Sequence, residues 1–238
     1  MRRLKLLGLS LMAVLALSTL ASAVAHAAIT PPLMLPGPGT TFTITGLGEP
    51  ELATVGGRKF RCEKVKGSGE ATSDSLGTFK VLFEKCKDAV LGTTCTGLGL
   101  SSGTIETKGE YHLRWLLPEP QKSGTDMVLL LEHVHYSCSI ALYLVLGCLV
   151  SMDIEKDDGT RLEPNELVEL FLILFLQTGG VQEPNSIDTA SGEAMEACSL
   201  KLKKGAEMAE EGVAWLMHWD VEKFINGGKK VSILIMTT

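Results

Sequence analysis

A G-x-S-x-G pattern spans residues 99–103 and places its serine at Ser101. In hydrolases that carry this pattern, a histidine oriented by an acidic side chain activates the serine. An aspartate (Asp153 or Asp188) and then His218 follow Ser101 in the chain order that these enzymes use. The pattern also requires a strand before the turn and a helix after it. A Gly-rich loop precedes it here and a strand-like segment follows, so a turn between strands is favoured, with Ser101 and His218 as the catalytic candidates.

Two histidines, His133 and His135, are separated by one residue, which places their side chains about 7 Å apart on one face of a strand. Such a pair can bind zinc or copper when a neighbouring strand supplies a third ligand. The available partners are His112, His218 and Glu132, although strand alternation points Glu132 to the opposite face. Two leucines share the expected face of the histidine pair, which equally fits a strand that emerges from the core. Because only two convergent ligands are visible, we predict no metal or other cofactor.

An acidic segment, residues 153–159, has the composition of a calcium-binding loop. The sixth position of such a loop is an invariant glycine and the twelfth is a glutamate. Here those positions hold Asp158 and Pro164. We therefore expect an acidic hairpin turn, with weak surface calcium binding as the alternative.

Trp215 and Trp219 lie four residues apart and fall on one face of a predicted strand, about 13 Å from each other. An exposed pair of this kind could stack against a sugar polymer or a peptide. Their neighbours on the same face are Val213, Met217 and Val221. An apolar strand face is usually buried, so the core interpretation is favoured over a binding platform.

Six cysteines form an even set, which in an exported protein indicates disulfides. Cys86 and Cys95 flank a short loop that contains a glycine, so we expect them to close it. A direct bond between Cys138 and Cys148 is disfavoured, because residues 139–147 read as one continuous strand that is too long to bridge. A Cys-ligated metal or a redox site is disfavoured because no C-x-x-C pattern occurs. The predicted pairs are Cys86–Cys95, Cys62–Cys138 and Cys148–Cys198.

Period-two alternation dominates the chain and predicts half-buried strands. Phe79, Val81 and Phe83 alternate with more polar neighbours, and the pattern recurs at residues 111–115 and 213–221. Glycine-containing turns separate these segments, as in sandwiches and barrels. We predict an all-β fold, a disulfide-stabilised sandwich or barrel of roughly eight to twelve strands with Gly-rich turns.

Two further segments have a helical alternative, because residues 165–176 and 191–211 contain good helix formers. Two strongly apolar runs, residues 140–150 and 170–176, have the length of core strands. Insertion of these two runs into a membrane is disfavoured by their short length and by the turn-rich spacing around them.

The N-terminus reads as an export signal. Arg2, Arg3 and Lys5 precede an apolar run, which ends at the small-x-small pattern Ala25-His26-Ala27. Residues 1–27 are therefore predicted to be a signal peptide, with 21–23 as an alternative cleavage pattern. Residues 28–39 contain four prolines and form an extended, mobile leader, and residues 40–238 form a single β-rich domain. We expect a secreted or extracytoplasmic protein with no transmembrane span after cleavage.

The charge balance argues against a protein that binds its partners through bulk positive charge of its own. The chain has 28 acidic and 22 basic residues, a formal net charge of −6. Signal cleavage would remove basic residues only and make the protein more acidic. We therefore expect no nucleic-acid partner and no attraction to anionic membrane surfaces.

Several segments together resemble secreted β-rich proteins of soil actinobacteria that have no known function. The shared features are the export signal, a strand that ends in a cysteine (residues 83–86), Cys95-Thr96 before a Gly/Ser turn, and residues 177–184. The resemblance covers residues 40–236 and implies a bacterial, β-rich, secreted domain. It implies no activity, cofactor or catalytic residue.

No motif in the sequence establishes an activity. Export and disulfides without a supported catalytic set favour a non-enzymatic secreted module of the cell envelope with a binding or structural role. The alternative is an extracellular hydrolase or a metal-dependent enzyme. An exposed apolar patch or an aromatic groove would favour the binding role.

Overall fold

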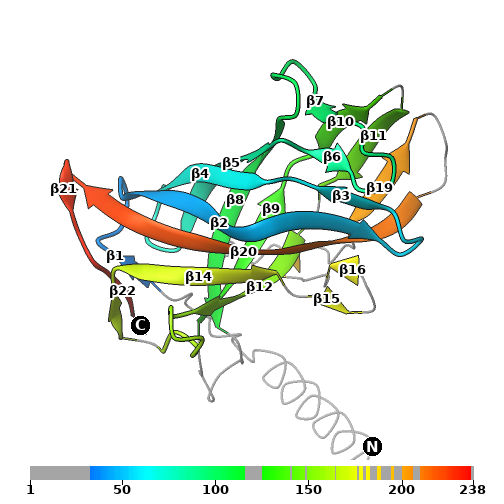
Figure 1. Cartoon of the computed structure of the whole chain (residues 1–238). Helices are drawn as coiled ribbons and strands as arrows, with labels where there is room; N and C mark the ends of the chain where they lie inside the picture. Colours follow the sequence, from blue (N-terminus) through cyan, green and yellow to red (C-terminus); the bar gives the residue numbers. More distant parts are fainter. Residues whose placement is uncertain are drawn as a thin grey trace, which may run out of the picture.

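The computed structural model describes residues 33–115, 125–139, 141–147, 149–163, 165–175, 177–178, 181–182, 187–188, 194–195, 200–205 and 210–236. Within these residues the chain forms strands and turns and contains no helix (Figure 1). This confirms the predicted all-β class.

Eight antiparallel strands close into a barrel, which we call the main barrel. Neighbouring strands in the barrel follow one another along the chain, and the last strand returns to pair with the first. The barrel alternative of the predicted fold is therefore the correct one. The strands in barrel order are β2 (Thr41–Thr54), β4 (Lys64–Ala71), β5 (Leu76–Glu84), β8 (Ile105–Trp115), β9 (Thr125–Leu131), β12 (Leu149–Glu155), β14 (Leu170–Phe175) and β20 (Glu210–Asn226).

The two longest strands, β2 and β20, extend beyond the main barrel and begin a second set of pairings, which we call the side ring. Their register shifts between Leu47 and Glu51, where the main barrel ends. From β20 the pairing continues to β19, β11, β10 and β7, and from β2 it continues to β3 and β6. A bridge between Lys87 and Thr94 joins β6 to the start of β7. The added strands are β3 (Lys59–Arg61), β6 (Lys87–Asp88), β7 (Cys95–Gly97), β10 (Val134–Cys138), β11 (Ala141–Leu146) and β19 (Lys201–Lys204).

A three-stranded sheet lies at the other end of the main barrel from the side ring (Figure 1). It contains β1 (Leu33–Leu35), β22 (Ile233–Met236) and β13 (Leu167–Val168). Met34, Ile233 and Ile235 are buried and belong to the hydrophobic core. Part of the predicted leader is therefore extended, as expected, but it is held in a sheet rather than mobile.

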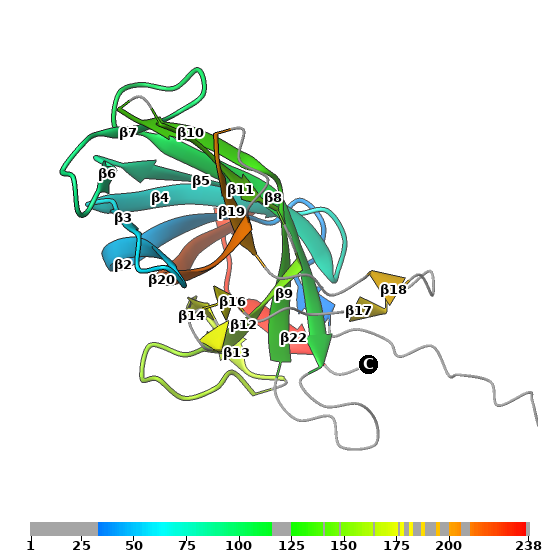
Figure 2. The ribbon, with the colours of Figure 1, turned by 90° about the vertical axis from the view of Figure 1, so that its right-hand side faces the viewer.

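Short strand pairs complete the described fold. They are β15 (Gln177–Thr178) with β16 (Val181–Gln182), β17 (Ile187–Asp188) with β18 (Ala194–Met195), and β21 (Lys229–Lys230) with the end of β20. Figure 2 shows β17 and β18 as a separate small hairpin. The helical alternative for residues 165–176 is not realised, because β14 pairs with both β12 and β20. The described parts of 191–211 contain no helix and include the strands β18, β19 and the start of β20.

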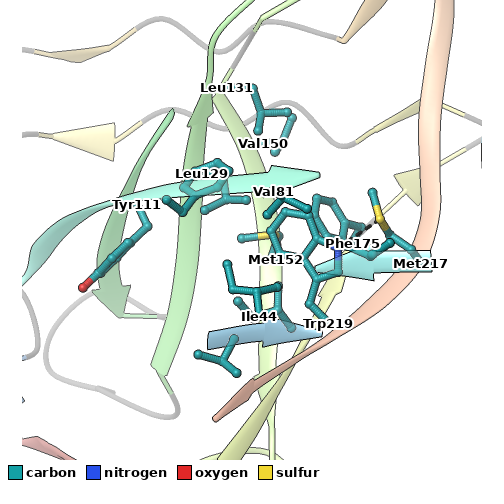
Figure 3. Close-up of a cluster of buried hydrophobic side chains, with 14 of the residues drawn as sticks. Ile44, Val81, Tyr111, Leu129, Leu131, Val150, Met152, Phe175, Met217 and Trp219 are labelled. Carbon is teal, nitrogen blue, oxygen red and sulfur yellow. Dashed lines mark hydrogen bonds between the residues drawn. The ribbon is translucent and has the colours of Figure 1, made fainter. Parts of the chain in front are cut away.

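Aromatic and aliphatic side chains fill the interior of the main barrel (Figure 3). The Trp219 side chain is 1% exposed, and its ring centroid lies 4.8 Å from that of Phe175 and 6.0 Å from that of Phe79. Its indole N–H donates to the sulfur of Met217 at 3.1 Å. The space left among the core side chains is only about 10 Å³. A void of that size holds at most one water molecule, so this interior is a packed core rather than a ligand cavity.

Glycines in the strands make room for the rings of this core. A Cβ atom added at Gly77 would lie 2.2 Å from Cε1 of Tyr111 and 2.3 Å from the carbonyl oxygen of Glu70. One added at Gly69 would lie 2.2 Å from the ring of Phe42. These strand glycines are therefore explained by close packing inside the barrel.

Candidate functional site

Ser101 lies in the turn between β7 and β8, not between a strand and a helix. The amide of Thr104 donates to the carbonyl oxygen of Ser101 at 3.0 Å, and the amide of Gly97 donates to that of Thr104 at 2.7 Å. His218 lies on the main barrel, where β20 pairs with β14. The described residues contain no hydrogen bond between Ser101 and a histidine. The structure therefore places Ser101 in a hairpin turn and does not join it to His218.

Only His135 of the two histidines lies in a strand. His133 lies in the connection between β9 and β10, and its Nδ1 accepts a hydrogen bond from the amide of Gly147 at 3.0 Å. His135 lies in β10 with its side chain exposed. His112 is 13% exposed, and burial lowers its pKa against the opposing effect of Glu110. Within the described ranges, no three His, Cys, Asp or Glu side chains form a group that could hold a metal ion.

The acidic segment forms the expected hairpin turn. The amide of Lys156 donates to the carbonyl oxygen of Thr160 at 2.7 Å, and a bridge pairs Glu155 with Arg161. Arg161 also donates to Asp153 at 2.9 Å. Asp158 accepts a hydrogen bond from the amide of Thr160 at 2.9 Å, so local hydrogen bonds hold this side chain in the turn.

Two of the remaining candidates lie in strands that the sequence placed correctly. Trp219 lies inside the main barrel, so its ring is not available for stacking on an external ligand. Trp215 belongs to β20, and its side chain is outside the described part of the structure. Asp188 ends the short strand β17, and its side chain is outside the described part of the structure.

The disulfides differ from the predicted pairs. Cys62 is bonded to Cys86, and Cys95 is bonded to Cys138. The predictions Cys86–Cys95 and Cys62–Cys138 are therefore wrong, and the predicted Cys148–Cys198 bond lies outside the described residues.

Strand pairing explains this connectivity. The amide of Cys95 donates to the carbonyl oxygen of Cys86, so the short loop does close, but through its backbone. The Cα atom of Cys62 lies 4.0 Å from that of Cys86, where β3 meets β6. Cys95 and Cys138 are direct cross-strand partners in β7 and β10, with Cα atoms 4.1 Å apart. Each disulfide thus joins two hairpins of the side ring.

A hollow of about 500 Å³ lies on the outer face of the side ring, over β7, β10 and β11. Four leucines line it, and we call it the leucine groove: Leu98, Leu100, Leu142 and Leu144. Leu98 is 85% exposed and Leu142 is 64% exposed. His135, Thr96 and Ser137 add polar atoms to the same hollow. An exposed cluster of large apolar side chains at a concave site is typical of a ligand or partner surface.

The sequence of β11 explains why leucines face outward. Its residues are Ala-Leu-Tyr-Leu-Val-Leu, apolar on both faces. Tyr143 and Val145 point into the side ring, so the alternating Leu142 and Leu144 must point out. We interpreted the run 140–150 as a core strand and the segment 139–147 as continuous, but a turn at Ser139 separates β10 from β11. Apolar residues at both alternating sets of positions were the sequence signal for this site, but we interpreted the run as a core strand.

The interior of the side ring is less completely filled than the main barrel. An apolar cavity of about 50 Å³ lies among Phe60, Phe83, Val145 and Met217. The carboxylate of Glu51 lines its edge and accepts hydrogen bonds from Lys59 and Arg61. This cavity is far below the roughly 300 Å³ minimum of typical ligand pockets, so the leucine groove is the stronger candidate.

Comparison with family models, curated proteins and solved structures finds no match. Within the described residues, no helix is long and apolar enough to cross a membrane.

Proposed function

We propose that the protein is a secreted, non-enzymatic binding module of the cell envelope and that the leucine groove is its binding surface. The export signal read from the sequence and the disulfides of the side ring support an oxidising compartment outside the cytoplasm. The proposal depends mainly on one observation, the exposure of Leu98 and Leu142 around a hollow of about 500 Å³.

An uncharged fluorescent dye, Nile red, tests this surface, because its emission changes when it enters an apolar site. The informative variant is Leu142→Asn. Loss of one leucine contact should weaken dye binding roughly 5-fold to 10-fold, since burying a large aliphatic side chain contributes about 1–1.5 kcal/mol in a partly open site. Leu167 is a matched control, because it is 65% exposed in β13, at the other end of the main barrel. Leu167→Asn should leave dye binding unchanged.

Either of two results would contradict the proposal. The native protein could bind no dye, or the two variants could bind it equally. Circular dichroism of both variants would show whether each retains the native fold.

A further inference from the structure

We infer that the leucine groove binds a neutral aliphatic compound, an unbranched alkyl chain that carries one uncharged hydrogen-bonding group such as a hydroxyl. This inference rests on the proposed function, because it names the class of ligand for the same surface. The alkyl chain would lie against the leucines, and the hydrogen-bonding group would lie beside the hydroxyl of Ser137.

Polar and apolar side chains lie next to one another across the strands under the groove. Thr96 of β7, Ser137 of β10 and Leu142 of β11 are successive cross-strand partners. In the neighbouring row, His135 of β10 is the partner of Leu144 of β11. All of these side chains line the hollow. A ligand that lies on the leucines of β11 would therefore meet the two hydroxyl groups within the same hollow.

The Ser137 hydroxyl is placed to bond a ligand. The side chain is half-buried, and it has no hydrogen-bond partner among the described residues. The Thr96 hydroxyl oxygen accepts a hydrogen bond from the amide of Gly103 at 3.0 Å, which leaves its hydrogen available to donate. Each hydroxyl can both donate and accept. A ligand hydroxyl between the two could accept from Thr96 and donate to Ser137.

The lining of the groove favours an uncharged ligand. Among the described residues that line the hollow, none is Asp, Glu, Lys or Arg. A charged group that leaves water without meeting an opposite charge loses much of its hydration energy. A hydroxyl, by contrast, exchanges its hydrogen bonds with water for hydrogen bonds with the groove. The same hollow therefore disfavours both an anionic and a cationic end group.

The strands around the groove argue against a peptide or a sugar. β10 is paired with both β7 and β11, and β11 is also paired with β19, so a peptide cannot add to either as a further strand. The rings of Tyr136 and Tyr143 are buried inside the side ring and present no face on which a sugar could stack. An alkyl chain needs only apolar contact area, which Leu98 and Leu142 supply.

The experiment measures dissociation constants by calorimetry for 1-octanol, octanoate and octylammonium, which share one chain length, all kept below micelle formation. At pH 8 free imidazole groups are neutral and both ionic compounds remain charged. 1-Octanol should bind several-fold more tightly than either ion, because only the ions lose hydration without gaining an opposite charge. From 1-hexanol to 1-octanol, the affinity should rise by up to about 4-fold per added methylene.

Substitutions of one serine separate the hydroxyl from the apolar contacts. Ser137→Ala should weaken 1-octanol binding roughly 3-fold to 10-fold, because one hydrogen bond is lost, and should leave the gain per methylene unchanged. Ser137→Thr retains a hydroxyl and should bind 1-octanol as the native protein does. Ser68→Ala is the matched control and should change neither quantity, because Ser68 is an exposed serine of β4 on the main barrel.

The outcomes separate the inference from the proposed function. If octanoate or octylammonium binds as tightly as 1-octanol, or if Ser137→Ala binds 1-octanol like the native protein, the inference is overturned while the apolar binding surface stands. If none of the compounds binds but Nile red does, the inference again fails alone. If Nile red does not bind either, the proposed function fails as well.

Discussion

Removal of the two disulfides should loosen the side ring and leave the main barrel folded. Both bonds join short strands: β3 and β6 share two register pairs, and β7 and β10 share three. The main barrel contains no described disulfide and is closed by long antiparallel pairings. The informative variants are the double substitutions Cys62→Ala with Cys86→Ala, and Cys95→Ala with Cys138→Ala.

The sequence separations give the expected size of each effect. The bonded cysteines are 24 residues apart in the first pair and 43 in the second. Loop-closure entropy then predicts a loss of about 3.4 kcal/mol for the first bond and about 4.0 kcal/mol for the second. Cys86 and Cys95 are hydrogen-bonded neighbours, so the two losses should be coupled and their sum is an upper limit for the double removal. Each loss corresponds to a fall of roughly 10 °C in Tm for a domain of this size.

Hydrogen exchange followed by mass spectrometry locates the effect. Amides of β7 and β10 should lose protection in the Cys95/Cys138 variant, while amides of β5 and β8 keep it. The buried Trp219 should retain its native fluorescence, because it lies in the main barrel. Nile red binding should weaken, since β7 and β10 underlie the leucine groove. Reduction of the native protein with a thiol serves as the control and should reproduce the combined effect.

Two results would refute this reasoning. Equal loss of protection in β5 and β7 would mean that the barrel and the ring unfold as one unit. A disulfide map in which Cys86 is bonded to Cys95 would mean that the loop, not the strand pairing, determines the connectivity.

Three further changes test the packing and the charges. Gly77→Ala should lower the unfolding free energy in urea by about 1–3 kcal/mol, because the added methyl group would overlap a tyrosine ring and a backbone oxygen; unchanged stability would contradict this packing. Burial raises the pKa of Glu51, but hydrogen bonds from Lys59 and Arg61 outweigh it and lower the pKa below its usual value near 4.5. The ionised carboxylate therefore stabilises the fold above that value, and this contribution is lost as the pH falls through the lowered pKa. Glu51→Gln should flatten the acid side of the profile of stability against pH. A variant profile that runs parallel to that of the native protein would refute the ion-pair role. Val145→Ile should raise the Tm by adding about 0.8 kcal/mol of burial in the cavity of about 50 Å³, and a lower Tm would show that the cavity cannot accept the methylene.

The strands could be predicted from the sequence because their side chains alternate between environments. Phe79, Val81 and Phe83 are all buried in β5, and Lys80 between them is exposed. Alternation with a period of two is a local property of the sequence, so it can be recognised without knowing which strands pair with one another. Barrel closure is not local: β2 pairs with β20, and Thr41 lies opposite Ile225. No window of the sequence contains that pairing, and a sandwich therefore stayed open as an alternative.

The disulfides were predicted wrongly for the same reason. Sequence distance favoured Cys86 with Cys95, and the hairpin does bring their backbones together. The side chains of a hairpin, however, can meet the strands on either side of it. Cys62 and Cys138 arrive from those flanking strands, so the bonds depend on the order of strands around the ring.

The position of the candidate site follows from how the main barrel and the side ring use their apolar residues. The main barrel needs its inward side chains for packing and leaves about 10 Å³ of space. The side ring leaves a cavity of about 50 Å³, which cannot hold a chain of several carbons. The proposed ligand therefore has to bind outside the described interiors. β11 and the turn after β7 are where large apolar side chains face outward around a hollow. The second disulfide joins β7 and β10 next to Thr96 and Ser137, which line that hollow. Because β7 and β10 share only three register pairs, we expect this crosslink to hold the two strands together and, in the proposed binding role, to reduce the ordering cost of binding.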